Sequence, residues 1–358
     1  MNRLENMSKP LVWSTALLLT AIVAGCGGST GAAGTPGTPG VPGTPAPGTN
    51  PSAVNLLSAS TYALTTSAAL SATGAASGIS FGGNVAMDAP TSTCTATPAN
   101  ATIQTGGIAV DQCGMETGTI DFVNGPITPT AAAGLTITGK TIRYNPVGKP
   151  NSAAFNATVR AVKTDVNTAW QYAFNQASVF PISGPGALDG LILPPGVYYS
   201  ASSMTLGTGQ TLTLDAGAGN ANAANAVWIF KVGSSLTVNG ATVACSGTTP
   251  PVCTPTQVVL KNGALAKNVF WQVGTPDSKG ALVAGGGDVT FAAATGAAGN
   301  NTIFAGTILA GNSVTLNTVA LTGRVLAGAA LSGVPNVQTG GKVTAIEGST
   351  GPVTVTLP

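Results

Sequence analysis

Short segments in which apolar and small polar residues alternate, each bounded by Gly or Asn, run through the sequence from about Val54 to its end. Examples are TLTLDAG from Thr211, SLTVNG from Ser235, DVTFAA from Asp288 and SVTLNT from Ser313. A period of two residues turns alternate side chains to opposite faces of a β-strand, so that one face is buried and the other meets solvent. The segments recur roughly every 20–25 residues, the spacing of coils in a solenoid. Because no strict repeat accompanies this spacing, the pattern predicts an irregular β-solenoid.

One segment follows a different period. Between Ser152 and Ala177, apolar residues lie three to four positions apart, as on one stripe of an amphipathic helix. The stripe consists of Phe155, Val159, Val162, Val166, Trp170, Ala173 and Phe174. Asn151 and Ser152 are suitable caps, and Pro181 prevents much continuation. We predict one helix over residues 152–178 that packs alongside the solenoid, with its aromatic side chains in the core rather than around a cofactor.

Charged residues are scarce, at 7% of the chain, and His is absent. Ordinary soluble domains carry about 25% charged residues, so hydroxyls, amides and small side chains must form most of this surface. The net charge is +2, without a basic cluster that could neutralise a row of phosphates. Nucleic acid is therefore excluded as a partner.

The acidic residues also disfavour an enzyme. Polysaccharide cleavage, which many β-helix proteins perform, requires paired carboxylates or a positioned base. The acids of this chain are scattered, mostly at turn positions, apart from a cluster of Asp111, Glu116 and Asp121. We therefore expect no enzymatic activity and no cofactor.

Residues 1–25 have the features of a secretory signal, with Arg3 and Lys9 as its positive flank. Its apolar stretch is shorter than the ~20 residues of a membrane span. The stretch ends in Val-Ala-Gly-Cys, which resembles a bacterial lipobox and implies that Cys26 becomes the lipidated first residue of the mature protein. An ordinary signal peptide cleaved near Ala24 is the alternative.

Gly27 follows the lipidated position in place of an acidic residue, which favours the outer membrane or cell surface over retention at the inner membrane. The alternative is secretion.

Residues 26–52 are rich in Gly, Pro and Thr, as in GTPGTPGVPGTP from Gly34. Such a segment cannot bury apolar surface, so we expect a flexible tether before the folded domain at 53–358.

Four further cysteines, Cys94, Cys113, Cys245 and Cys253, belong to the folded domain. An even number in an exported protein indicates disulfides, and proximity in the sequence favours the pairs Cys94–Cys113 and Cys245–Cys253. A metal site is the rival interpretation. It is disfavoured because the chain has neither a His nor a Cys-x-x-Cys pair.

A series of segments follows the predicted helix in a characteristic order. The series is LPPGVYYSAS from Leu193, TLTLDAG from Thr211, AVWIFKVGSSLTV from Ala226, NGALAKNVFWQVG from Asn262, FAGTILAGNSVTLNT from Phe304 and GRVLAGAALS from Gly323. In this order they closely resemble the ice-binding-protein family of cold-environment microbes. The resemblance is strong over 188–331 and fair over 54–85. Residues 86–150 depart from the family, and we expect them to be an insertion that caps the open end of the solenoid or binds a partner.

The resemblance implies a right-handed, three-faced β-solenoid, in which the first coil stacks beside the last ones and the helix lies alongside. It also implies that one flat β face adsorbs ice, with ice or ordered water as the partner. We expect the protein to be a monomer.

Alternation identifies the side chains that would face outward to meet the ice. They are Thr211, Thr213, Ser235, Thr237, Asn239, Thr290, Ser313, Thr315 and Asn317. Coils ~4.8 Å apart and alternate residues ~6.7 Å apart would arrange these groups in a two-dimensional grid. A Thr presents a hydroxyl and a methyl group, and its β-branching limits the rotamer entropy lost on adsorption. Asp288 and Ala292 interrupt the grid, which predicts moderate rather than very strong binding.

The alternative function is that of a non-catalytic adhesin or structural lipoprotein that binds carbohydrate or another cell. The tether and lipid anchor fit this function equally well. A sugar platform would need exposed Trp or Tyr, whereas Trp228 and Trp271 lie in apolar segments that are predicted to be buried strands. The aromatic residues therefore argue mildly against it.

Overall fold

A computed structural model describes the protein at residues 50–67, 70–73, 78–87, 104–105, 108–109, 127–129, 135–137, 141–143, 152–178, 180–182, 186–240, 255–278, 281–283, 286–294, 301–330, 341–346 and 351–358. Of the two units into which the chain divides, Met1–Gly43 and Thr44–Pro358, these residues belong to the second. The signal segment, the tether up to residue 49, and the predictions for Cys26, Cys94, Cys113, Cys245 and Cys253 lie outside the described residues.

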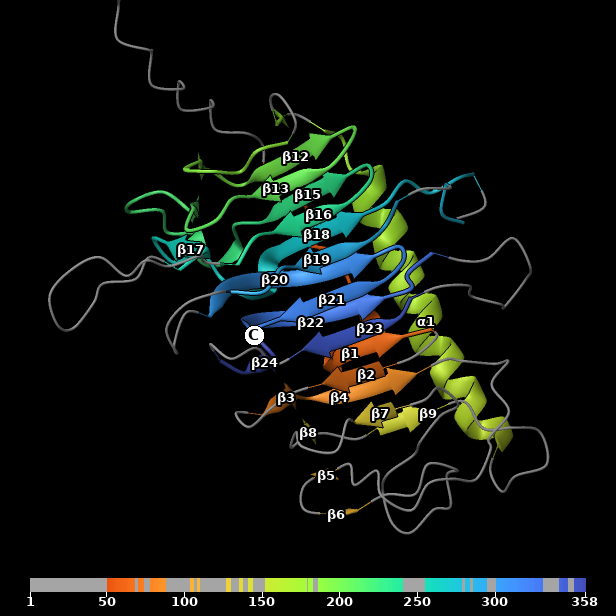
Figure 1. Ribbon diagram of the computed structural model, residues 1–358. Coiled ribbons are helices and arrows are strands. Elements are labelled where there is room, and N and C mark those ends of the chain that lie inside the picture. Colours follow the sequence, from red (N-terminus) through yellow and green to blue (C-terminus); the bar gives the residue numbers. More distant parts are fainter. Residues whose placement is uncertain are drawn as a thin grey trace, which may run out of the picture. The chain divides into compact units, whose positions relative to one another are not determined.

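Parallel strands stack in coils with three faces, labelled a, c and b in the order in which the chain visits them (Figure 1). Face a consists of β10 (Phe180–Pro181), β12 (Gly196–Ser200), β15 (Trp228–Val232), β18 (Val269–Val273), the second halves of β20 (Thr302–Ala310) and β22 (Val319–Ala327), β1 (Tyr62–Thr66), β4 (Asn84–Met87) and β9 (Thr141–Arg143). Face c consists of β13 (Met204–Leu206), β16 (Leu236–Val238), β19 (Val289–Phe291), β21 (Val314–Asn317), β23 (Val343–Ile346), β2 (Leu70–Thr73) and β7 (Ile127–Pro129). Face b consists of β11 (Ile192–Leu193), β14 (Thr211–Asp215), β17 (Gln257–Lys261), the first halves of β20 and β22, β24 (Val353–Thr356), β3 (Ile79–Gly82) and β8 (Leu135–Ile137). The predicted β-solenoid with three faces is therefore confirmed.

Strands β20 and β22 each pass from face b to face a without a break, and glycines make this corner possible. Gly306 and Gly323 are register partners in the two strands. A Cβ atom on Gly323 would lie 1.8 Å from the carbonyl oxygen of Gly306, and Gly306 itself has a φ of 116°. Residues with a side chain rarely adopt such a φ, so the bend requires Gly.

The first coil of the chain pairs with the last one in the middle of the stack. Strand β1 pairs with β22, β2 with β23 and β3 with β24, all in parallel. Within residues 86–150, β7, β8 and β9 pair with β2, β3 and β4 and so add one more coil. Strands β5 (Gln104–Thr105) and β6 (Ile108–Ala109) form an antiparallel pair, and β5 also pairs with β8.

The predicted helix returns the chain from one end of the stack to the other (Figure 1). It is α1 (Ser152–Asn175), which ends three residues before the predicted boundary. Its 24 residues span roughly 36 Å. The eight steps between the nine described strands of face a, at ~4.8 Å each, span nearly the same distance, so the helix is about as long as the stack that it follows.

Side chains along one stripe of α1 hold it to the corner between faces a and c. Val162, Val166, Trp170 and Ala173 of the predicted stripe are buried. The indole Nε1 of Trp170 donates to the carbonyl of Val273 at 2.9 Å. At other positions of the same stripe, two buried polar residues also reach coil carbonyls. They are Lys163, which donates to Ala327 at 2.8 Å, and Asn167, which donates to Ala329 at 2.6 Å.

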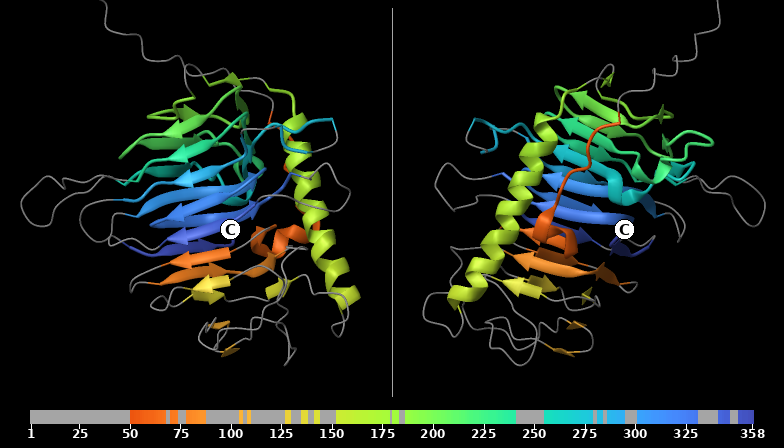
Figure 2. Two further views of the ribbon diagram at one scale, coloured as in Figure 1. Left: turned by 45° about the vertical axis from the view of Figure 1, so that its right-hand side comes forward. Right: turned by 180° about the vertical axis from the view of Figure 1, so that it is seen from behind.

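A second element covers the outer side of face a. This N-terminal strap, residues 50–61, includes the short helix η1 (Leu57–Thr61) and lies beside α1 against the sheet (Figure 2, right). Val54 and Leu56 of the strap are buried. Its ends are fixed by hydrogen bonds, from the amide of Val227 to Asn50 Oδ1 at 2.8 Å and from Arg324 Nη2 to the carbonyl of Ser60 at 2.7 Å. Face a is therefore closed to solvent over much of its area, whereas neither α1 nor the strap covers faces b and c.

Aromatic side chains stack inside the solenoid from coil to coil. The ring centroids are 5.3 Å apart for Phe180 and Tyr198, 5.4 Å for Tyr198 and Phe230, and 4.0 Å for Phe230 and Trp271. Trp271 Nε1 donates to the carbonyl of Ala305 at 3.0 Å. Trp228 and Trp271 are buried, as predicted. Two further short helices, η2 (Ala223–Asn225) and η3 (Ala266–Asn268), precede β15 and β18.

We expect Trp271→Ala to lower the free energy of unfolding by about 3–5 kcal/mol, because it leaves a cavity in the aromatic stack between Phe230 and Phe304. The matched control is Tyr199→Ala on the outer side of face a. Tyr199 is 37% exposed, and a surface substitution of this kind costs about 0.5 kcal/mol or less. Chemical denaturation measures both, and equal losses would contradict the central role of the stack.

Candidate functional site

The outer side of face c carries a column of threonines. Register pairs align Thr205 with Thr237, Thr237 with Thr290, Thr290 with Thr315 and Thr315 with Thr344. Their neighbours along each strand point inward and are buried, as Leu236 and Val238 are in β16. All five threonines of this threonine column are partly or fully exposed. The register continues to Ser71 of β2 and Thr128 of β7.

The hydroxyls of the threonine column are available to solvent. In the described part of the chain, none of the five has a hydrogen-bond partner in the protein. The column beside it, called here the edge column, is different. It contains Ser203, Ser235, Asp288, Ser313 and Lys342, and its polar atoms bond largely to one another and to the backbone of the next coil.

The third outward column of face c is mixed. It contains Gly207, Asn239, Ala292, Asn317 and Ile346. Among the described outward positions of face c, Asp288 and Lys342 are the ionisable residues, and both lie in the edge column. The centre of the face therefore presents hydroxyl and methyl groups without charge.

The predicted candidates do not form a single grid. Ser235, Thr237, Asn239, Thr290, Ser313, Thr315 and Asn317 lie together on face c. Thr211 and Thr213 lie on β14 of face b, which is a different surface. Alternation distinguishes inward from outward positions, but it does not say on which of three faces a strand will lie.

Face b is less regular than face c. Thr211, Gln257, Ile303, Ala320 and Thr354 are aligned in one column, and Ser80 follows Thr354. Gln257 Nε2 donates to the hydroxyl of Thr211 at 3.2 Å, so that this hydroxyl is already engaged. Ile303 is 44% exposed and interrupts the column of polar groups.

Thr205 and Thr344 belong to the threonine column but were not among the predicted residues. Each lies between two buried residues, Met204 and Leu206 in β13 and Val343 and Ala345 in β23. The same alternation that selected Thr237 could therefore have found them.

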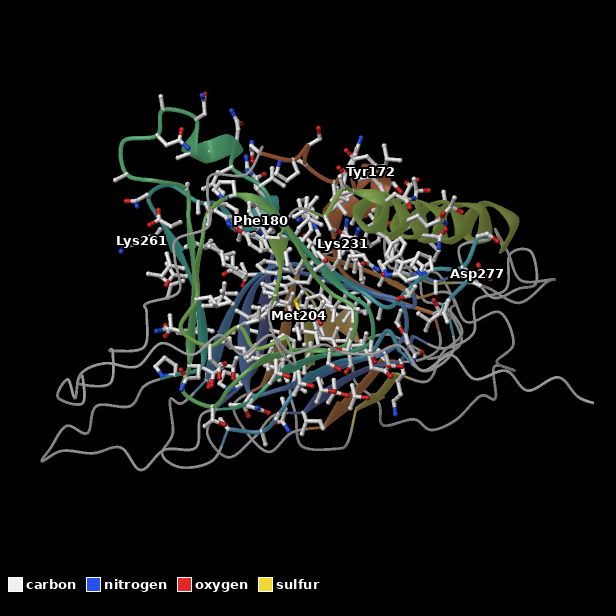
Figure 3. All side chains as sticks on the ribbon, turned by 90° about the horizontal axis from the view of Figure 1, so that it is seen from above. Tyr172, Phe180, Met204, Lys231, Lys261 and Asp277 are labelled. Atoms are coloured by element: carbon white, nitrogen blue, oxygen red, sulfur yellow. The ribbon has the colours of Figure 1, made fainter. Side chains whose placement is uncertain are left out.

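Figure 3 shows the side chains in a view down the stack. Met204 is among the interior side chains, while Tyr172 and Lys231 are on the side of α1.

A charged group lies at one end of face b. The carboxyl of Asp215 accepts hydrogen bonds from Asn262 Nδ2 at 2.6 Å and from the amide of Gly217 at 2.8 Å. These two bonds, with a smaller contribution from the nearby charge of Lys261, lower the pKa of Asp215 below its usual value. This arrangement secures the corner after β14 and leaves the carboxylate away from the threonine column.

The described residues contain neither a metal site nor a membrane helix. No group of three or more His, Cys, Asp or Glu in this part of the chain could hold a metal ion. Likewise, none of the helices described is long and apolar enough to cross a membrane.

The parallel coils, the helix alongside and the hydroxyl-bearing face define the class of protein: a three-faced β-solenoid with an exposed sheet whose central column is uncharged. The family model described as ice-binding-like matches residues 63–334. Because this match covers more than half of the chain, the protein belongs to the ice-binding-like family.

A curated relative and several solved structures are similar to the chain. Ice-binding protein 1 of Shewanella frigidimarina (strain NCIMB 400) is 36% identical over 124 residues, which cover 34% of this chain and 12% of the relative. The crystal structure of an ice-binding protein from an Antarctic biological consortium covers 88% of this chain, and 95% of its own, at a TM-score of 0.52 and 20% identity. The ice-binding protein of an Arctic yeast covers 86% of this chain, and 94% of its own, at a TM-score of 0.50 and 22% identity. At such identities these structures establish the shared fold.

We expect Asn262→Gly to raise the pKa of Asp215 toward its usual value, because the largest cause of the lowering is lost. Gly suits the position, since Asn262 has a φ of 52°. A carboxyl with a lowered pKa stabilises the fold above the pKa of the unfolded chain, and this contribution disappears as the pH falls through the folded pKa. In the variant that loss therefore begins at a higher pH. An NMR titration of the Asp215 carboxyl measures the change, and an unchanged pKa would contradict the assignment.

Proposed function

We propose that the protein adsorbs to ice through face c. The observation that carries the proposal is the threonine column, whose five hydroxyls are in register and have no hydrogen-bond partner in the described part of the chain. Strands ~4.8 Å apart set the spacing along the column, and outward residues ~6.7 Å apart set the spacing across it. Each hydroxyl can place one water, while the adjacent methyl favours ordered water around it.

Rigidity supports this proposal, because a template for ordered water must hold its groups at constant spacing. A β-branched side chain has few χ1 rotamers, so little entropy is lost when it adsorbs. The inward neighbours of the threonines are fully buried. The names of the matched relatives, which are ice-binding proteins, support the same function.

We also propose that the protein acts as a monomer, without catalysis or a cofactor.

The test is thermal hysteresis and inhibition of ice recrystallisation by purified residues 50–358. We expect Thr237→Tyr, Thr290→Tyr and Thr315→Tyr each to lower both activities several-fold, since a ring that projects from the face holds the other threonines away from ice. The control is Thr168→Tyr, at an exposed position of α1. Thermal unfolding of each variant shows whether the fold is intact.

Face b provides the contrasting variants. Thr322 and Thr356 are exposed there on adjacent strands, in register. Loss of activity in Thr322→Tyr and Thr356→Tyr, with full activity in the face c variants, would keep the function and move the site to face b. A wild-type protein without any ice activity would overturn the function and favour adhesion to carbohydrate or another cell.

We further propose that the protein is exported and anchored through a lipid on Cys26, at the outer membrane or cell surface. The lipobox-like Val-Ala-Gly-Cys sequence supports this. We expect metabolic labelling with palmitate to mark the wild type and to leave Cys26→Ser unlabelled, with the variant released from the membrane fraction. Labelling that persists in Cys26→Ser would contradict the anchor, and release of both proteins would favour secretion.

A further inference from the structure

The backbone ladder of face c is thinnest in the middle of the threonine column. Two register pairs, Val289 with Val314 and Thr290 with Thr315, join β19 to β21. By contrast, three pairs join β16 to β19, and four join β21 to β23. Thr290 and Thr315 are thus held in register by the shortest ladder within the column.

Side chains of the edge column reinforce this step. One carboxylate oxygen of Asp288, Oδ1, accepts a hydrogen bond from Asn312 Nδ2 at 2.7 Å and another from the amide of Ser313 at 3.1 Å. Asp288 and Thr290 are both outward residues of the β19 segment, and Ser313 directly precedes β21. The carboxylate therefore fastens the start of β19 to the start of β21, beside the thin ladder.

The connection continues to the following coil. Asn312 Oδ1 accepts a hydrogen bond from the amide of Gly341 at 3.3 Å, and Ser313 Oγ accepts one from the amide of Lys342 at 3.2 Å. On the other side of β19, the carbonyl of Asp288 accepts a hydrogen bond from the amide of Leu236 at 3.0 Å. Hydrogen bonds through Asp288, Asn312 and Ser313 thus link four successive strands of face c, from β16 to β23.

We propose that Asp288 is a positioning residue for ice adsorption, which keeps Thr290 and Thr315 in register across the weakest step of the face. This inference rests on the proposed function of face c. It replaces the expectation that Asp288 only interrupts the grid. The carboxylate lies in the edge column and uses one oxygen to bind the neighbouring coil, so it acts on ice through the threonines and not by contact.

The test compares Asp288→Ala, which removes the acceptor, with Asp288→Asn, whose side-chain oxygen can accept the same two hydrogen bonds without the charge. The control is Asp277→Ala, which removes an exposed carboxylate from the turn between β18 and β19. Hydrogen exchange is measured at the amide of Val289, which donates to the carbonyl of Ser313 across the same step. Thermal hysteresis and thermal unfolding are measured on the same proteins.

For Asp288→Ala we expect faster exchange at Val289 and a several-fold lower thermal hysteresis, with the protein still fully folded at the temperature of the ice assay. Asp288→Asn should keep the exchange rate at Val289 and the thermal hysteresis close to their wild-type values. Asp277→Ala should leave both quantities unchanged. Full hysteresis in Asp288→Ala, or a loss in Asp288→Asn as large as that in Asp288→Ala, would overturn the positioning role.

The two proposals fail in different ways. If the wild type shows hysteresis that no face c variant changes, the site lies elsewhere and Asp288 has no role in it. If the wild type binds ice through face c but Asp288→Ala matches it in hysteresis and exchange, the positioning role alone is wrong. Faster exchange with intact hysteresis would also overturn it, because adsorption would then not depend on the register of β19 and β21.

Discussion

The parallel pairing between the first and the last coil is the interaction on which the rest of the structure depends. Strands β1, β2 and β3 each bond to a strand from the end of the chain, one on every face. Each face is therefore continuous through the middle of the stack, although its strands come from both ends of the sequence. On face c this continuity brings Ser71 of the first coil into register with Thr344.

The long helix is a consequence of that pairing. The early coils, up to β9, occupy one end of the stack. The chain must therefore pass along the whole stack to β10 at the other end before the remaining coils can form between them. A helix suits this path because its turn of ~5.4 Å is close to the ~4.8 Å between coils. Lys163 and Trp170, two turns apart on α1, donate to the carbonyls of the last residues of β22 and β18, which are two coils apart. The helix thus satisfies carbonyls at the corner while it buries its apolar stripe.

The three faces divide the structural and surface roles between them. Face a is covered over much of its area by α1 and the strap. On face c, the edge column uses its polar atoms to join the coils, and the threonine column leaves its hydroxyls unpaired. A hydroxyl that is already bonded to the protein offers less to ordered water than a free one. On face c, bonded and free polar groups therefore lie in adjacent columns. The edge column holds the coils together, and the threonine column leaves its hydroxyls available to water.

The amino-acid sequence by itself determined the local structure and the direction of the side chains. Alternation separated Leu236 and Val238 from Thr237, and the spacing of Val162, Val166 and Trp170 indicated the helix, because both patterns follow from the geometry of one segment. The tertiary structure alone decided which outward residues share a face. Thr211 and Thr237 have the same local pattern, yet they lie on faces b and c. The corners between strands set this assignment, and the pairing of successive coils sets the register that places Thr344 beside Thr315.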